Sequence, residues 1–281
     1  MSHLALLFML QITVSTKAGY VNYVQGSANV SITQTVSSHT PIRTGSGAFA
    51  EVLLNPGSYV RLDENSEIEF DGMEMPDLGL RLISGNALIE AAGFDKRTPL
   101  TVTTGTLEAE IVADGIYLVS PGKVLILDGK AQASNGKNAY GKNWELSKTD
   151  SVHAVKVTRR QPLSLEQWST RRSEEAARAN FEAASKLREE PNVKMSSLFD
   201  VWLWSSSLGG YTYLPGYGFR SPYGHQYLAV RDIFVVGGLV LGRDHRPASD
   251  KTDPTINAPA VTATTPTAPA SPAPRPAPAP R

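Results

Sequence analysis

The sequence predicts a mainly β protein: an antiparallel β-sandwich or roll built from hairpins, followed by one long helix, a small aromatic lobe and a disordered C-terminal tail. Two observations predict the β domain. Between residues 20 and 157, short strand-like runs alternate with turn-forming residues at intervals of about 8–12 residues, as in sandwiches and barrels. Four turns, at residues 55–58, 85–86, 114–115 and 128–129, also carry hairpin signals such as Asp-Gly, which tolerates the positive φ angles of a type I′ turn.

Composition excludes several classes of function. The 281 residues include 27 Lys and Arg against 27 Asp and Glu, and no Cys. A chain without net charge lacks the basic excess that captures nucleic acid, so we expect no nucleic-acid partner. The lack of Cys excludes disulfides, thiolate catalysis and Cys-ligated metal sites.

The N-terminal residues 1–18 are predicted to be a signal peptide. An apolar run from Leu4 to Leu10 is too short to span a bilayer, and the small residues Thr16 and Ala18 precede a cleavage site before Gly19. The region before the apolar run offers only His3 where Lys or Arg is expected. An ordinary buried strand or helix is the alternative.

Residues 19–158 carry an ordered series of motifs. The opening segment Gly19–Val30 has the spacing G-x-V-x-x-V-x-G-x-x-x-V. The central segment contains a Thr-Gly before a strand, a Gly-Ser turn, and a strand that leads to Asn-Ser. The segments of the series after the opening are Ile42–Gly45, Ala50–Ile68, Leu82–Ile89, Pro99–Thr104 and Val124–Lys130. In this order they resemble the FecR-type domains, which are periplasmic sensor domains best known from iron-uptake signalling.

The resemblance implies an exported all-β interaction domain. Signalling members of the family carry a cytoplasmic segment that engages a sigma factor, and then a membrane helix, before this domain. We expect neither here, because the β domain begins at residue 19. The family's late G-T-x-F strand is also replaced by Asp114–Leu118. These differences leave a role in transmembrane signalling open.

Residues 162–190 are predicted to form an amphipathic helix that Pro191 ends. Ser164 is the expected N-cap, with Gln167 completing a capping box, and Trp168 is expected to dock the helix on the β domain. The helix region also carries five arginines that alternate with glutamates, which favours a solvated, salt-bridged face. The arginines are Arg159, Arg160, Arg171, Arg172 and Arg178.

Residues 199–242 form an aromatic segment rich in Gly and Pro. One interpretation is a ring-stacking platform for a polysaccharide or peptide, since Tyr and Trp offer rigid apolar faces with a polar handle. The other is a compact lobe whose rings form its own core or cover the sheet. The predicted partner-binding residues are Trp202, Trp204, Tyr211, Tyr213, Tyr217, Phe219 and Tyr223. The apolar run from Ile233 to Leu241 is expected to be a buried strand.

No catalytic residue, cofactor or metal site is predicted. The five histidines are scattered, and no nucleophile elbow, phosphate loop or dinucleotide fingerprint is present. The best enzymatic candidate is an acidic stretch, in which two carboxylates could hydrolyse a glycoside or several oxygens could bind calcium. Alternation with apolar residues instead favours the outward face of a strand. The stretch comprises Asp63, Glu64, Glu67, Glu69, Asp71, Glu74 and Asp77.

We therefore expect a non-catalytic binding or scaffolding protein of the bacterial cell envelope, periplasmic or secreted, without a stable transmembrane span. Its FecR-like domain would engage an envelope protein or a polysaccharide. Two alternatives stay open: a periplasmic sensory regulator of the iron-uptake signalling type, and an envelope carbohydrate hydrolase that uses acidic residues. Residues 243–281 contain ten of the nineteen prolines among Ala, Thr and Ser, and are expected to form a disordered tail.

Overall fold

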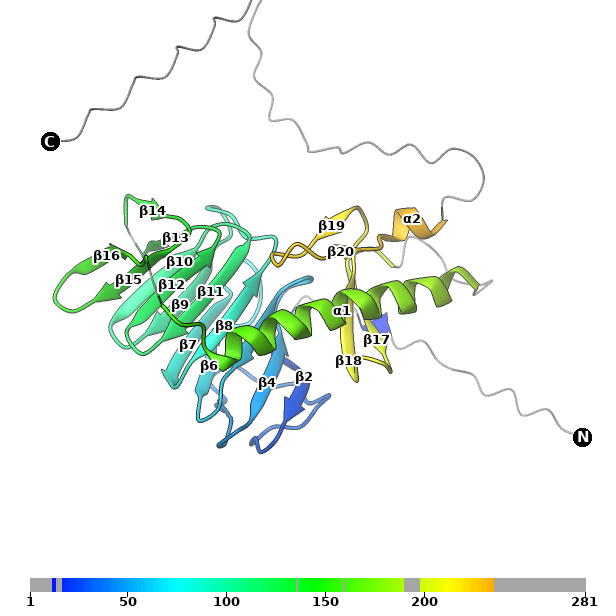
Figure 1. The fold of residues 1–281 in the computed structure, drawn as a ribbon, viewed down its shortest axis with the longest axis horizontal. Coiled ribbons are helices and arrows are strands. Elements are labelled where there is room, and N and C mark those ends of the chain that lie inside the picture. Colours follow the sequence, from blue (N-terminus) through cyan, green and yellow to red (C-terminus); the bar gives the residue numbers. More distant parts are fainter. Residues whose placement is uncertain (1–11, 14–16, 135, 159, 190–197, 235–281) are drawn as a thin grey trace, which may run out of the picture. The chain divides into compact units, whose positions relative to one another are not determined.

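The computed structural model describes residues 12–13, 17–134, 136–158, 160–189 and 198–234 (Figure 1). An eight-stranded antiparallel sheet has the order β16-β15-β12-β11-β8-β5-β4-β2. Its strands are β2 (Tyr20–Gln25), β4 (Phe49–Leu53), β5 (Tyr59–Leu62), β8 (Ala87–Ala91), β11 (Gly115–Ser120), β12 (Lys123–Asp128), β15 (Trp144–Lys148) and β16 (Val152–Lys156). The predicted mainly β, antiparallel fold is thus confirmed.

A seven-stranded sheet has the order β14-β13-β10-β9-β7-β6-β3, and within it only β7 and β9 run parallel. Its strands are β3 (Ile42–Arg43), β6 (Glu67–Gly72), β7 (Gly79–Ser84), β9 (Leu100–Thr104), β10 (Leu107–Ile111), β13 (Ala131–Ala133) and β14 (Ala139–Tyr140). The two sheets pack face to face around one apolar core that draws on both, for example Val60 and Val119 from one sheet and Phe70 and Val102 from the other.

Only one of the four predicted hairpins is a hairpin: β4 and β5 pair across residues 55–58. The other three turns, at residues 85–86, 114–115 and 128–129, carry the chain from one sheet to the other. At the two Asp-Gly corners, the Tyr117 hydroxyl donates a hydrogen bond to the Ala113 carbonyl (2.7 Å) and accepts one from the Lys130 N–H (2.9 Å). A Cβ on Gly129 would lie 2.2 Å from that hydroxyl. Glycine is therefore needed at this corner between the sheets, because the backbone approaches the Tyr117 side chain too closely for any other residue.

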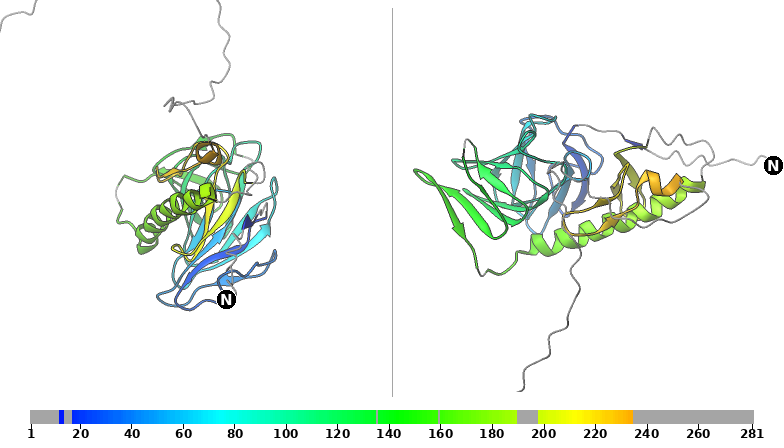
Figure 2. Two further views of the ribbon diagram at one scale, coloured as in Figure 1. Left: turned by 90° about the vertical axis from the view of Figure 1, so that its right-hand side faces the viewer. Right: turned by 90° about the horizontal axis from the view of Figure 1, so that it is seen from above.

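Helix α1 (Ser164–Glu189) lies across the outer face of the eight-stranded sheet, where it contacts β5 and β8 (Figures 1 and 2). The helix is capped one residue earlier than expected, and only half of a capping box is present. The Leu163 N–H donates to the Glu166 side chain at Oε1 (2.8 Å), whereas the Glu166 N–H donates to the Leu163 backbone carbonyl (3.1 Å), because leucine offers no side-chain acceptor. Trp168 docks the helix as predicted, stacked on Phe49 with ring centroids 4.9 Å apart. In the part of the chain that the structure describes, no helix combines the length and apolar character that a membrane span requires.

The aromatic segment forms β17 (Val201–Ser205), β18 (Gly210–Leu214), β19 (Phe219–Arg220), β20 (Gln226–Tyr227) and the short helix α2 (Val230–Phe234). β17 pairs with β18 on one side and with β1 (Ile12–Thr13) on the other. Ile233 and Phe234 belong to α2 rather than to the predicted strand, and the rest of that run lies outside the described residues.

The two ends of the chain carry predictions that stay untested. The described part of the predicted signal peptide includes β1 and Ala18, which is buried and donates its N–H to the Met73 carbonyl (2.8 Å). Its other residues, 1–11 and 14–16, lie outside the described part, as does the whole predicted tail. Cleavage before Gly19 therefore remains a prediction.

Candidate functional site

A buried cluster of four charged residues joins the sandwich to helix α1. Glu51 on β4 and Arg61 on β5 are cross-strand partners, and Glu90 lies on the next strand, β8. Arg61 Nε lies 2.7 Å from Glu51 Oε2, and Arg61 Nη1 lies 2.7 Å from Glu90 Oε2. Arg172 Nη2 of α1 lies 3.1 Å from Glu51 Oε1. No side chain of the four is more than 5% exposed, so the cluster is closed to solvent.

Two serines one helical turn apart complete the contact from α1. The Ser169 hydroxyl accepts a hydrogen bond from Arg61 Nη1 (2.8 Å), and the Ser173 hydroxyl donates to Glu90 Oε1 (2.7 Å). The Tyr223 hydroxyl, from the aromatic segment, donates to Ser169 (2.8 Å). The helix therefore presents a polar stripe to the sheet. Arg172, which the sequence placed on a solvated face, belongs to that stripe.

Asn22 on β2 links the sandwich directly to β18. Its amide donates to the Tyr211 carbonyl (3.0 Å) and accepts from the Tyr211 N–H (2.6 Å), as a neighbouring strand would. The same amide donates to Glu51 Oε1 (2.8 Å). One side chain thus connects the charge cluster, the sheet edge and the C-terminal segment.

We expect Asn22→Ala to lower the free energy of unfolding by about 1–3 kcal/mol, because three hydrogen bonds at buried groups are lost. Urea unfolding measures the change. Asn29→Ala is the matched control, since the Asn29 amide also makes two hydrogen bonds (2.7 and 2.8 Å) but at an exposed position. Equal losses for the two variants would contradict the structural role assigned to Asn22.

The electrostatics of the cluster keep its side chains charged, which suits a structural role rather than proton transfer. Burial alone would raise the pKa of Glu51, but the charges of Arg172 and Arg61, together with hydrogen bonds from Arg61 and Asn22, outweigh it and lower the pKa to about 2. Burial would likewise lower the pKa of Arg61, and the charges of Glu51 and Glu90 raise it instead. With this lowered pKa, Glu51 stays ionised. A general acid needs a raised carboxyl pKa instead, so Glu51 is not suited to that role.

The acidic residues of β6 lie on the outward face of a strand, as expected, whereas Asp63 is buried. On β6, Glu67 and Glu69 alternate with the buried residues Ile68 and Phe70. Three of the carboxylates are held in ion pairs: Arg43–Glu67 (2.8 Å), Arg81–Asp71 (2.9 Å) and Lys17–Glu74 (2.6 Å). Burial raises the pKa of Asp63. Across the described residues, no group of His, Asp and Glu is arranged to hold a metal ion.

The seven predicted partner-binding residues fall into three groups by exposure. Trp202, Tyr211 and Tyr213 are buried, whereas Tyr217 is 63% exposed. The half-buried residues are Trp204, Phe219 and Tyr223. Trp202 packs edge-on against Tyr59 of β5 (centroids 5.3 Å apart) and against Tyr213 (5.9 Å), so these rings fill the contact between β17–β18 and the sandwich. Tyr217 lies apart, beside Phe199 (5.7 Å).

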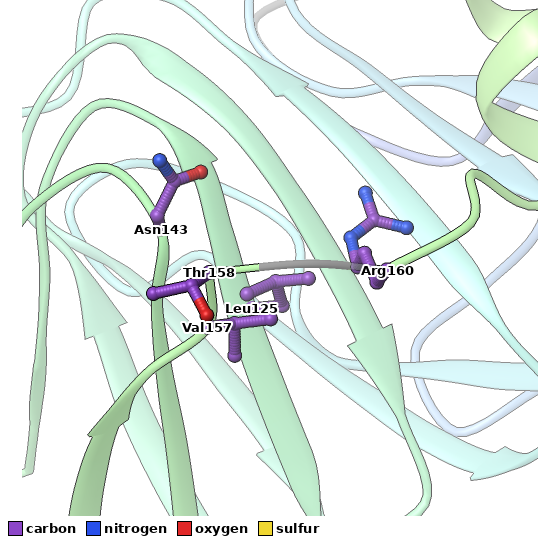
Figure 3. A pocket seen from close by; sticks show the side chains of 5 residues that line it. All are labelled: Leu125, Asn143, Val157, Thr158 and Arg160. Carbon is purple, nitrogen blue, oxygen red and sulfur yellow. The ribbon is translucent and has the colours of Figure 1, made fainter. Parts of the chain in front are cut away.

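An open groove of about 390 Å³ lies where the chain leaves β16 and crosses toward α1. Figure 3 shows Asn143 and Arg160 at its ends and Leu125, Val157 and Thr158 between them. A second pocket of about 260 Å³ shares Leu125 and Arg160 with it. Arg160 is fixed by an ion pair with Glu166. No sequence motif marks this groove, because its residues come from separate strands and a linker.

Part of the sandwich matches a known protein family. Residues 40–132, about a third of the chain, match the model of the family described as FecR protein. The chain is similar to FecR proteins over this range. The predicted resemblance is therefore confirmed for this range, and β2 and β14–β16 extend the same sandwich beyond it.

Two crystal structures of a "putative anti-sigma factor" from Parabacteroides distasonis are similar to this chain, at 14% and 13% identity and a TM-score of 0.36 each. Each alignment covers 47% of this chain and 63% of the other, so the chain spans less than two thirds of those proteins. A comparison with curated proteins finds no match.

The Thr-Gly and Asn-Ser positions of the matched region hold the turns at one end of the sandwich. Thr44 Oγ1 donates to the Asp63 carbonyl (2.5 Å) and accepts from the Ser66 N–H (3.0 Å). Ser66 Oγ accepts from the Asn86 N–H (2.9 Å), and Ser120 donates to Asn86 Oδ1 (2.8 Å). The family positions in this chain therefore have structural partners rather than an open site.

Proposed function

We propose that this protein is a non-catalytic, exported binding or scaffolding protein of the bacterial cell envelope, whose FecR domain engages a protein partner. The family match over residues 40–132 carries the proposal, because FecR-type domains act in the envelope by contacting other proteins. The predicted polysaccharide partner is less favoured, since three of the seven candidate stacking residues are buried against the protein itself.

The state of the carboxylates supports a non-catalytic role. Glu51 and Glu90 approach the same guanidinium, that of Arg61, and are closed to solvent. Glycoside hydrolysis needs one carboxyl with a raised pKa and a second within reach of substrate. The acidic residues of β6 face solvent beside arginines and line neither of the two pockets described above. The hydrolase alternative is therefore the least supported.

The groove of Figure 3 is the surface that we assign to the partner. Its floor is aliphatic, from Leu125 and Val157, and its rim offers an amide, a hydroxyl and a guanidinium. An apolar floor with a few polar groups is typical of ligand-binding clefts. An extended peptide matches that pattern, with apolar side chains on the floor and backbone groups at the rim.

A sensory regulator is the second candidate, and the FecR match favours it as well. In that case the same groove would report on a receptor in the envelope. The two candidates differ in consequence rather than in surface: loss of partner binding would change gene expression only for a regulator. Transcript levels in cells that carry a groove variant separate them.

Filling the groove tests the proposed partner surface. Thr158 is exposed on the rim, and Thr158→Trp is expected to weaken partner binding about tenfold, which corresponds to about 1.4 kcal/mol. The measurement is quantitative capture from envelope extract with the full chain, followed by titration of the captured protein. Thr40→Trp, at an exposed threonine before β3, is the matched control. Unchanged capture by Thr158→Trp would remove the groove from the proposal.

A further inference from the structure

Among the described residues, strand β16 pairs only with β15, so it forms an open edge of the eight-stranded sheet there. The Val157 N–H donates to the Asn143 carbonyl (2.8 Å), and the Thr149 N–H donates to the Ser151 carbonyl (3.3 Å). Hydrogen-bonded pairs alternate along an antiparallel ladder, so every second residue faces β15. The backbone groups of the residues between, Val152, Ala154 and Lys156, therefore point away from the sheet.

The opposite end of the eight-stranded sheet, at β2, and the β3 end of the seven-stranded sheet are covered. At β2, the Val21 N–H donates to the Gln34 carbonyl (2.8 Å) and the Val21 carbonyl accepts from the Thr33 N–H (2.9 Å). At β3, the Arg43 carbonyl accepts from the Asn29 N–H (3.1 Å). By contrast, β16 exposes two aliphatic side chains, Val152 (42% exposed) and Val155 (59%). An open edge with exposed valines is a template for another strand.

We propose that β16 is a self-association site, at which the strand pairs antiparallel with β16 of a second copy of this chain. The register places Ala154 opposite Ala154 of the second copy, so that Val152 lies opposite Lys156. The residues whose backbone groups point away from the sheet, Val152, Ala154 and Lys156, then all form hydrogen-bonded pairs with the second copy. The pairing is two-fold symmetric and joins the eight-stranded sheets of the two copies. It goes beyond the proposed function and does not depend on it.

Charge and side-chain placement favour a second copy as the occupant. In this register Lys156 lies diagonally beside Asp150 of the second copy, at the β15–β16 turn, and symmetry repeats the contact. Val155 lies opposite His153 of the second copy and diagonal to its Val155, which covers the most exposed aliphatic residue of the strand. A shift of four residues would instead bring Lys148 opposite Lys156, and like charges oppose it.

A single engineered cysteine tests the register, because the chain has none of its own. Hydrogen-bonded antiparallel pairs have Cα atoms about 5.5 Å apart, within the range that a disulfide bridges. We expect full-length Ala154→Cys to form a covalent dimer under mild oxidation. The control is Ile83→Cys, on the other sheet and 48% exposed. Equal cross-linking at both positions, or none at residue 154, would overturn the proposal.

Sedimentation of the full chain without cysteine gives an independent readout. The dissociation constant of the dimer is expected to rise about tenfold in Lys156→Asp, because two attractive contacts become repulsive. The double variant Asp150→Lys/Lys156→Asp restores the pairing with reversed charges and should recover most of the loss. Circular dichroism confirms folding of each variant. A chain that stays monomeric at all concentrations, or a double variant no better than the single one, would contradict self-association through β16.

Discussion

Replacing Arg61 by methionine is expected to lower the free energy of unfolding by about 3–5 kcal/mol. The variant leaves Glu90 buried without its guanidinium partner and Glu51 with Arg172 alone, and an uncompensated buried charge is far more costly than a lost surface contact. Since a domain of this kind is stable by only about 5–15 kcal/mol, the loss is a large fraction of the total. Urea unfolding followed by tryptophan fluorescence measures it.

Arg43→Met is the matched control for that variant. Arg43 also pairs with a glutamate on a neighbouring strand, Glu67, at 2.8 Å, but its side chain is 53% exposed. An exposed pair contributes little because water and salt screen it, so the control should be near neutral. If both substitutions cost the same, burial is not what makes the Arg61 cluster important.

The pH dependence of the Arg61 variant should have the opposite sign to that of the unmodified protein. In the unmodified protein the pKa of Glu51 is lowered from 4.5 to about 2, so its contribution is complete above 4.5 and is lost as pH falls toward 2. Without Arg61, the effect of burial on Glu51 is opposed less strongly, and the pKa of the Glu51 carboxyl rises. Protonation then relieves the buried charge, and the difference from the unmodified protein should shrink between pH 7 and pH 5.

The strands were predictable from the sequence, whereas their partners were not. Alternation and turn residues locate β6, β9 and β12 because each side chain responds to its own environment. Asp114-Gly115 and Asp128-Gly129 satisfy every local rule for a hairpin, yet both turn between sheets. The deciding contact is the Tyr117 hydroxyl, which ties the two corners together and is invisible in a window of ten residues.

The charge cluster was missed for a related reason. Glu51 and Arg61 alternate with apolar residues, as solvated positions on a half-buried strand would. Their face is covered only because α1 returns over the sheet about a hundred residues later, bringing Arg172, Ser169 and Ser173. One signal was present in the sequence. Ser169 and Ser173, which are one helical turn apart, lie beside Arg172 on the same face of the helix, and a solvated arginine does not need small polar neighbours. Helix position and the Trp168 contact, which depend on local pattern, were predicted correctly.

The aromatic segment left two interpretations open, and Trp202→Ala separates them. Trp202 is fully buried between Tyr59 and Tyr213, so removing its ring leaves a cavity at the contact between β17–β18 and the sandwich. We expect the free energy of unfolding to fall by about 3–5 kcal/mol. Trp202→Phe should cost only about 1–2 kcal/mol, because the ring is largely kept and Nε1 has no hydrogen-bond partner among the described residues.

The same variant set distinguishes a core from a binding platform by which quantity changes. A core residue alters the unfolding free energy, and partner affinity falls only as the folded fraction falls. A platform residue alters affinity while stability stays constant. Tyr217→Ala is the comparison at the exposed end of the segment, where the ring is 63% exposed and its loss should leave stability nearly unchanged. If Trp202→Ala unfolds at the same urea concentration as the unmodified protein but no longer captures its partner, the buried-core assignment of this ring is wrong and the platform interpretation holds.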